Sequence, residues 1–186
     1  MKQEIRVLGI DDSPFDKWKD KKTLILGVFY RGGNFLDGVL SSYAKVDGSD
    51  ATMKIACMAL KSKFYTQLRA IMLNGIAVGG FNIVDIRKLN KKTGIPVIVV
   101  MRKLPKMGEI EAALKKLKMG KKIRLIKSAG EIRKSGKVFI QVAGTSFEEA
   151  AEIVKLTATH SFVPEPIRVA HLVASGLAFG ESRGKV

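Results

Sequence analysis

The sequence contains few acidic residues, and this is the most informative feature of its composition. The 186 residues include 33 Lys and Arg but only 17 Asp and Glu, so the formal net charge is +16. A surface rich in ion pairs, as in heat-adapted proteins, would show Glu rising together with Lys. The excess of cations instead favours a polyanionic partner such as nucleic acid.

Cysteine and long hydrophobic runs are also scarce. The one cysteine, Cys57, excludes an internal disulfide, and its apolar helical surroundings predict a buried structural thiol in a reducing cytoplasm. No stretch is long and apolar enough to span a bilayer, so we expect no membrane segment. Residues 1–4 lead directly into the first predicted strand, so we expect no signal peptide.

Proline is rare too, with five residues, while hydrophobic residues make up 46% of the chain. This composition argues against disorder and is enough for a substantial core. There is no internal repeat and no low-complexity linker, so we expect one domain over residues 1–186.

The first part of the chain predicts three antiparallel strands. Apolar runs and alternation place them at residues 5–11, 23–30 and 35–46. A polar loop at 12–22 and a glycine turn at 31–34 connect them. The chain then changes to alternating strands and helices.

A helix follows the third strand, with Ser49 or Asp50 as its cap. Its predicted apolar stripe is Met53, Ala56, Cys57, Leu60 and Phe64. Later strands are predicted at 70–73, 96–101, 121–127 and 137–142, with helices at 81–92, at 109–118 and, as a final pair, from a capping box of Thr145 and Glu148. Three antiparallel strands followed by strand–helix–strand predict an α/β mixed sheet of ribonuclease H-like architecture with flanking helices.

Basic residues are concentrated between residues 102 and 137, which contain thirteen Lys or Arg and only three Glu. A solvated helix face explains any single lysine, but the excess predicts a stripe along a phosphate backbone. The candidate contacts are Lys115, Lys116, Lys118, Lys121, Lys122 and Arg124. Candidates for base stacking are Phe15, Trp18 and Tyr30, although a tryptophan such as Trp18 more often anchors a core or loop.

Acidic residues stand where strands end. Asp11 and Asp12 close the first strand, where a buried carboxylate needs a cation or hydrogen bonds. Strand geometry turns the two side chains to opposite faces, so we assign Asp11 to a Mg²⁺ or Mn²⁺ site and leave Asp12 as an equal candidate for capping the loop. Asp47 and Asp50 follow the third strand, where turn formation and capping compete with a metal role.

Four segments resemble endonuclease V, a family of metal-dependent nucleases that cut near deaminated bases. They are Gly-Ile-Asp-Asp-Ser at 9–13, Asn-Gly-Ile-Ala at 74–77, the strand at 94–102 and Pro-Glu-Pro-Ile-Arg-Val-Ala-His at 164–171. A smaller related archaeal family, associated with deoxyuridine-directed cleavage, is a closer match. Its Gly-Ile-Asp-Asp, Gly-Gly-Phe-Asn-x-Val-Asp-Ile and Gly-Glu-Ser-Arg-Gly motifs correspond to residues 9–12, 79–86 and 180–184.

The resemblance assigns roles to residues that spacing alone leaves open. It places Asp11 on a metal-binding aspartate, Arg102 on an active-site lysine and His171 beside the metal. Asp50 aligns loosely with a metal-binding glutamate. Asn74 replaces a metal-binding aspartate, and an amide oxygen is a neutral ligand that should hold the metal more weakly.

The function implied is a metal-dependent endonuclease acting on DNA that contains deoxyuridine or deoxyinosine. In it Asp11, Asn74 and either Asp47 or Asp50 hold Mg²⁺ or Mn²⁺. The alternative is a nucleic-acid-binding protein on the same fold without catalysis. Both explain the basic stripe, and only the first requires the acids to converge. DNA is favoured over RNA as the partner in either case.

Overall fold

A computed structural model describes residues 4–183, and its centre is a seven-stranded mixed sheet. The strands of this sheet are β1 (Arg6–Asp12), β2 (Lys22–Arg31), β3 (Phe35–Lys45), β4 (Leu68–Asn74), β7 (Val97–Met101), β8 (Arg133–Ser135) and β9 (Val138–Ala143). Their order across the sheet is β3-β2-β1-β4-β7-β9-β8. The strands β5 (Ala77–Val78) and β6 (Asn82–Ile83) form a separate small hairpin.

Strand directions decide where the ends of the central strands meet. β1 pairs antiparallel with β2 and parallel with β4, and β4 pairs parallel with β7. The carboxyl ends of β1, β4 and β7 therefore lie at one edge of the sheet, where loops build sites in open α/β sheets. Asp12, Asn74 and Met101 are the last residues of these strands.

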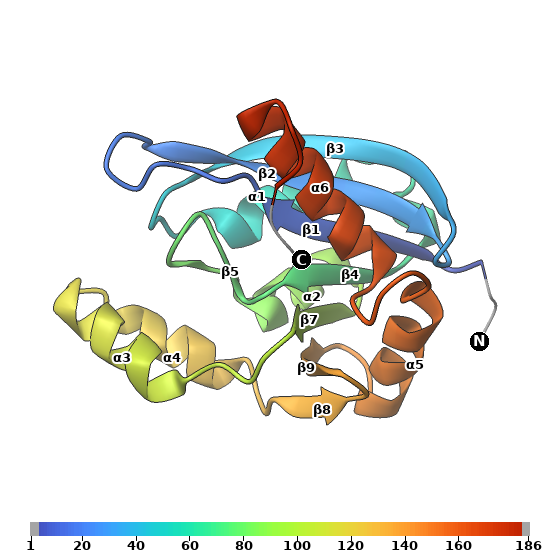
Figure 1. Ribbon diagram of the computed structural model, residues 1–186. Coiled ribbons are helices and arrows are strands. Elements are labelled where there is room, and N and C mark those ends of the chain that lie inside the picture. Colours follow the sequence, from blue (N-terminus) through green and yellow to red (C-terminus); the bar gives the residue numbers. More distant parts are fainter. Residues whose placement is uncertain (1–3, 184–186) are drawn as a thin grey trace.

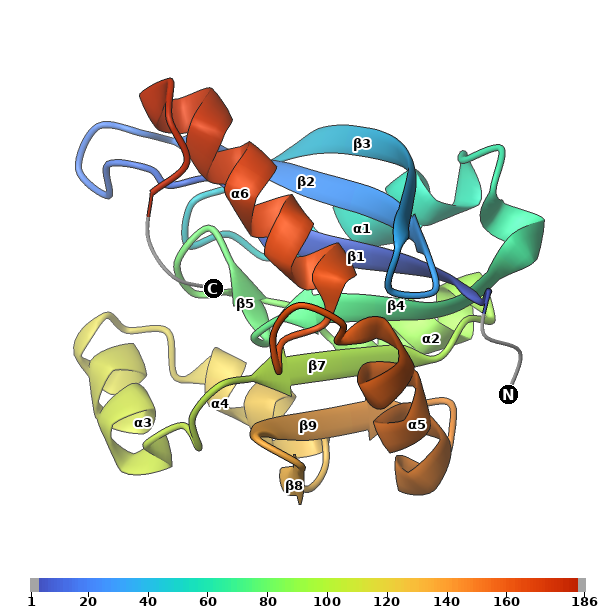
Figure 2. The same ribbon diagram turned by 45° about the vertical axis from the view of Figure 1, so that its right-hand side comes forward.

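Helices cover both faces of the sheet. They are α1 (Ala51–Leu60), α2 (Ile86–Thr93), α3 (Met107–Lys116), α4 (Lys121–Ser128), α5 (Phe147–Thr157) and α6 (Glu165–Phe179), with a short 3₁₀ turn at Tyr65–Gln67. α1 and α2 pack on one face, while α5 and α6 pack on the other, with α6 crossing β1 and β2 (Figures 1 and 2). α3 and α4 form a helical pair to one side of the sheet (Figure 1).

The predicted meander is confirmed. β1 is apolar and buried along most of its length, as a strand with a helix on each face requires. β7 is buried in the same way. The predicted glycine stop of the helix at 81–92 is also confirmed, because Gly94 caps α2 with a φ of 68°.

Several predicted elements were wrong. Residues 121–127 form helix α4 and no strand, because Ile123 and Ile126 are one helical turn apart and pack with Leu114 and Ile83. The helix at 81–92 begins only at Ile86, since the preceding residues complete the β5–β6 hairpin.

Two local predictions about helices differ slightly from the structure: the buried side of α1 and the cap residue of α5. Cys57 is exposed, because α1 turns Ile55, Met58 and Ala59 toward the sheet. Apolar residues surround this helix, so periodicity does not identify its buried side. The cap of α5 is Ser146, which accepts a hydrogen bond from the Glu149 backbone N–H, one residue after the predicted box.

Within residues 4–183, the structure has no helix of the length and apolar character that crossing a membrane requires. Residues 1–3, and Gly184 of the predicted tail motif, lie outside this range.

Candidate functional site

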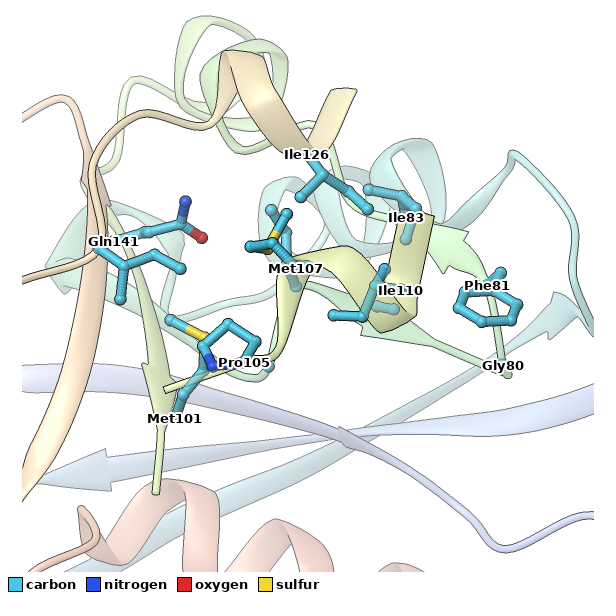
Figure 3. Close-up of a pocket in the computed structure, with 13 residues that line it drawn as sticks. Gly80, Phe81, Ile83, Met101, Pro105, Met107, Ile110, Ile126 and Gln141 are labelled. Atoms are coloured by element: carbon cyan, nitrogen blue, oxygen red, sulfur yellow. The ribbon is translucent and has the colours of Figure 1, made fainter. Parts of the chain in front are cut away.

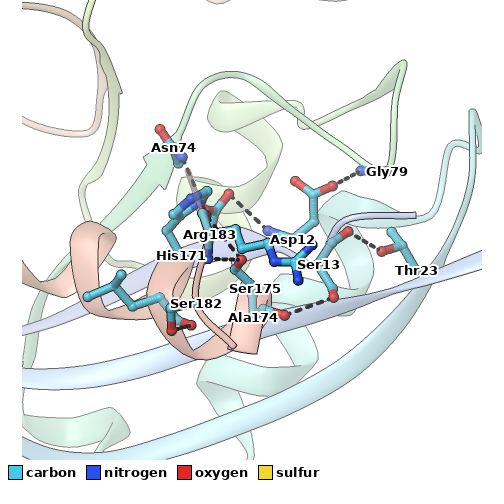
Figure 4. A network of polar contacts seen from close by, with 12 residues as sticks. Asp12, Ser13, Thr23, Asn74, Gly79, His171, Ala174, Ser175, Ser182 and Arg183 are labelled. Carbon is cyan, nitrogen blue, oxygen red and sulfur yellow. Dashed lines mark hydrogen bonds and ion pairs between the residues drawn. The ribbon is translucent and has the colours of Figure 1, made fainter. Parts of the chain in front are cut away.

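Asp11, Asn74 and His171 form a polar cluster, which we call the Asp11 cluster, in which Asp11 is buried and the other two residues are half-buried. Figure 4 shows Asn74 and His171 in this cluster. Asp11 and Asn74 lie at the carboxyl ends of the parallel neighbours β1 and β4, and His171 reaches them from α6. The Asn74 Nδ2 donates to Asp11 Oδ2 over 3.1 Å, and His171 Nδ1 lies 2.9 Å from the same oxygen. The structure thus brings together three of the residues singled out in the sequence.

The electrostatics of this cluster favour a charged imidazole. The hydrogen bond with Asp11, strengthened by its negative charge, raises the pKa of His171 above its ordinary value despite partial burial. The other ring nitrogen, His171 Nε2, is buried and makes no hydrogen bond of good geometry with the described residues, although the nearby Arg183 backbone also raises the pKa of His171. A buried N–H without a partner is costly, and a water or a substrate oxygen would satisfy it.

Asp12 turns to the other face of β1, as strand alternation predicts. Its Oδ2 accepts a hydrogen bond of 2.9 Å from the backbone N–H of Gly79, in the turn of the β5–β6 hairpin. Burial raises the pKa of Asp12 to about 6, against the lowering effect of the Gly79 hydrogen bond. Asp12 therefore holds the hairpin turn, and neither Ser13 nor Pro14 is its partner.

Asp47 and Asp50 lie in the turn between β3 and α1, and both carboxylates serve the same hairpin. Asp47 Oδ1 accepts from the Phe81 backbone N–H over 2.7 Å. Asp50 Oδ1 accepts from Asn82 Nδ2 over 2.7 Å and from the Lys45 N–H over 3.2 Å. Asp50 is the first residue before α1, but its side chain does not cap that helix.

Neither Asp47 nor Asp50 contacts the Asp11 cluster. Among residues 4–183 no three His, Cys, Asp or Glu side chains gather closely enough to hold a metal. The two carboxylates are occupied by the hairpin, so a metal role for them remains a prediction. Sequence spacing could not distinguish a metal-binding aspartate from a turn-forming one, because both roles favour Asp after a strand.

Lys122 corrects the predicted phosphate stripe. Its Nζ donates to the backbone carbonyl oxygens of Asp47, Gly48 and Phe81, at 2.7, 2.7 and 2.6 Å. All three ammonium hydrogens have acceptors, so none is free for a phosphate. Together with Asp47 and Asp50, Lys122 forms what we call the hairpin anchor, which joins α4 to β5–β6.

The remaining basic candidates are exposed on or beside α3 and α4. They are Lys115, Lys116, Lys118, Lys121 and Arg124. Arg102 follows β7 at the same sheet edge as Asn74, and its guanidinium lies 5.4 Å from the centre of the Phe162 ring. Trp18 lies in the loop between β1 and β2 and is 92% exposed, so it is no core anchor.

An apolar pocket, which sequence reasoning missed, begins one residue after Asn74. Its volume is about 250 Å³ (Figure 3). Its lining includes Ile76, Phe81, Met101, Met107, Ile110 and Ile126. Gly75 also lines it, one residue after Asn74, and Met101 is one residue before Arg102. The walls of the pocket come from segments that are far apart in the sequence. The only sign of it in the sequence is Gln141, a polar residue within an otherwise apolar strand.

Asp11 and Asn74 fit a hard divalent cation. Mg²⁺ keeps several waters and needs only one or two carboxylates, with substrate phosphates completing its ligands. Asp11 supplies a carboxylate, and the Oδ1 of Asn74 accepts no hydrogen bond from the described residues. The Nε2 of His171 without a partner is a further unsatisfied polar atom at this position.

The order of strands and the helices on both faces define a ribonuclease H-like protein, and comparison confirms this class. A solved endonuclease V from Ciona intestinalis, in complex with a 24mer DNA containing an inosine followed by a ribo-adenosine, matches with a TM-score of 0.59. The match covers 90% of this chain and 83% of that chain at 18% identity, which establishes the shared fold.

The chain belongs to the endonuclease dU family, whose model matches residues 3–178. A "UPF0215 protein" from Methanothermobacter thermautotrophicus is 48% identical over 189 residues, covering 99% of this chain and 93% of that protein. The crystal structure of a protein of unknown function from Archaeoglobus fulgidus matches at 41% identity with a TM-score of 0.87, covering 94% of this chain and 98% of that one. The resemblance to an archaeal family related to endonuclease V is confirmed.

Proposed function

We propose that this protein is a metal-dependent endonuclease that cleaves DNA containing a deaminated base, uracil or hypoxanthine. One observation carries the proposal: the Asp11 cluster and an apolar pocket meet at the end of β4, where Gly75 of the pocket lining directly follows Asn74. The first is suited to phosphodiester chemistry and the second to holding a base. The family's description as endonuclease dU supports the same activity.

Each residue of the site has a role that its position allows. Asp11 and Asn74 would hold Mg²⁺ or Mn²⁺, which when bound neutralises charge developing on the phosphate. His171 holds a proton beside Asp11, and its Nε2 is placed to orient water or to protonate a leaving oxygen. Arg102, at the same edge, would hold the phosphate by its guanidinium.

The pocket is where we expect the altered base to bind. Enzymes that do chemistry on a base take it out of the stack and hold it between apolar side chains, and we expect this nuclease to read its altered base in the same way. A cavity of about 250 Å³ is below the usual size of sites for drug-sized ligands, about 300 Å³ and upward, and suits a single ring system. Damaged or mismatched bases flip at lower cost, which adds selectivity.

The surface charge supports binding to a polyanion. The net charge is +16, and Lys115, Lys116 and Lys121 are exposed around α3 and α4. Each phosphate contact should contribute a slope of about −0.9 to the dependence of log affinity on log salt for duplex DNA. Charge reversal of these three lysines should flatten the slope, measured by fluorescence anisotropy. A slope equal to that of the unaltered protein would show that they form a solvated face only.

A cleavage panel tests the proposed function. Oligonucleotides with one uracil, one hypoxanthine or no altered base are incubated with the protein, with and without Mg²⁺ or Mn²⁺. We expect cleavage of the altered strands that requires the metal. Cleavage equal on all strands would reject base recognition, and cleavage unaffected by chelation would reject the metal.

The alternative is a nucleic-acid-binding protein without catalysis. The neutral amide of Asn74 and the engagement of Asp50 by the hairpin favour it, because both reduce negative charge at the site. Selective binding of uracil-containing DNA with no cleavage at any metal concentration would establish this alternative.

A further inference from the structure

The apolar pocket contains one polar side chain, and its chemistry is unusual for its position. Gln141 lies in the middle of β9 and is 3% exposed. Its neighbours Ile140 and Val142 are apolar, as are most residues that line the pocket. A buried amide is costly without hydrogen bonds, so an apolar residue would stabilise this strand better. The amide therefore needs an explanation.

The orientation of this amide is fixed. Gln141 Nε2 donates to the backbone carbonyl of Gly130 over 2.8 Å, and a carbonyl can only accept, so the nitrogen must face Gly130. The carbonyl oxygen of the amide, Oε1, accepts no hydrogen bond from the described residues. Figure 3 shows the amide turned toward the space beside Met107. The pocket thus offers a ligand one fixed acceptor and otherwise apolar walls.

We propose that Gln141 Oε1 determines specificity by accepting a hydrogen bond from the ring N–H that deamination creates. Cytosine has a bare acceptor at N3, and adenine has one at N1. Deamination places a hydrogen on each, giving the N3–H of uracil and the N1–H of hypoxanthine. A fixed acceptor pairs with both products and meets a lone pair in both parent bases. The inference rests on the proposed function, and it names the chemical group that the pocket reads.

The expected preference for deaminated bases comes from the cost of leaving a buried polar group unpaired. Placing a cytosine or adenine lone pair against Oε1 leaves two acceptors facing each other without water, whereas uracil and hypoxanthine satisfy the oxygen. Thymine and guanine also carry a ring N–H, so this contact discriminates only within each deamination pair. Their methyl and amino groups must be excluded by the shape of the cavity.

A structural role for Gln141 is the competing explanation, since its bond to Gly130 fastens the loop before β8. Gln141→Leu removes the amide at similar volume, and Gln141→Glu retains an oxygen but loses the fixed donor. Gln67→Leu is the matched control, because it makes the same amide-to-aliphatic change at an exposed glutamine outside the pocket. Thermal unfolding of each variant measures the structural contribution separately from recognition.

The test compares kcat/KM on strands that carry uracil, cytosine or N3-methyluracil, the last of which lacks the N–H. We expect Gln141→Leu to lower cleavage at uracil about tenfold relative to cytosine, and N3-methylation to lower cleavage by the unaltered protein by a similar factor. The two losses should not add, because both remove the same hydrogen bond. Gln67→Leu should retain the preference.

The outcomes separate the two proposals. If the unaltered protein cleaves at uracil but Gln141→Leu keeps the full preference over cytosine, the role of Gln141 is rejected and the proposed function stands. Additive losses from Gln141→Leu and N3-methylation would also reject it. If the unaltered protein cleaves none of the strands, the proposed function itself fails, and this inference fails with it.

Discussion

The Asp11 cluster and the hairpin anchor both place carboxylates after strands, yet the partners of those carboxylates differ. Asp11 Oδ1 accepts a hydrogen bond from the Asp12 backbone N–H, while its Oδ2 meets the side chains of Asn74 and His171. Asp47 and Asp50 accept from backbone N–H groups and an amide. The first arrangement brings side chains of β1, β4 and α6 together and leaves His171 Nε2 without a good hydrogen bond, whereas the second uses its carboxylates to hold a loop.

The largest expected effect separates the two regions by activity. Asp11→Asn should reduce cleavage by about 10³-fold, because it removes the charge that holds the metal, a contribution of several kcal/mol to the transition state. Asp50→Asn should retain most activity, since its partners lie in the hairpin. Single-turnover cleavage of uracil-containing DNA measures both. Equal losses in two folded variants would overturn the contrast.

The free energy of unfolding should depend strongly on the hairpin anchor, in contrast to the activity. Lys122→Met removes three charge-assisted hydrogen bonds and leaves three carbonyl oxygens without that donor, so we expect a loss of about 2–3 kcal/mol in the free energy of unfolding. Lys121→Met, on the exposed neighbour, should change it by less than about 0.5 kcal/mol. Urea denaturation compares them, and indistinguishable midpoints would remove Lys122 from the hairpin anchor.

Asp12 joins the two regions, and its titration is expected to appear in the stability of the metal-free protein. Burial raises its pKa from 3.8 to about 6, so between these values the folded state binds more protons than the unfolded state. Stability should then fall as pH rises through this window, by on the order of 2–3 kcal/mol from this group. Asp12→Asn keeps an acceptor for Gly79 and should remove that fall. Parallel curves from pH 4 to 7 for both proteins would contradict the raised pKa.

The smallest effect concerns Asn74. Asn74→Asp adds a negative charge beside Asp11, which should tighten Mn²⁺ binding by about tenfold if the side chain faces the metal. Activity titrated against Mn²⁺ measures the shift. Superimposable curves for the two proteins would place Asn74 outside the metal site, as a turn residue before Gly75.

Much of the fold follows from local patterns. The alternation and apolar runs of β1, β2, β3 and β7 are strong because these strands are long or buried on both faces. The segment at 121–127 was misassigned because short mixed runs satisfy strand and helix periods equally. The buried side of α1 was misassigned because apolar residues surround that helix. In both cases the packing partner, invisible in the local sequence, decided the outcome.

The candidate site divides in the same way. Asp11, Asn74 and His171 were identified by motif resemblance, and the parallel pairing of β1 with β4 under α6 explains why they meet. Lys122 was misassigned because its partners are carbonyl oxygens of the β3–α1 turn and the β5–β6 hairpin, which lie far from it in the sequence. The pocket and the orientation of Gln141 were missed because their parts are brought together from separate segments.

By itself, the sequence determined the cationic character of the protein, the order of its main strands and the aspartate at the end of the first one. These properties depend on composition and on neighbours along the chain. The tertiary structure alone decided which carboxylate meets Asn74 and His171, which carboxylates hold a hairpin, and which lysine is set against carbonyl oxygens. Those outcomes depend on contacts between residues 34 to 160 positions apart, which no local pattern encodes.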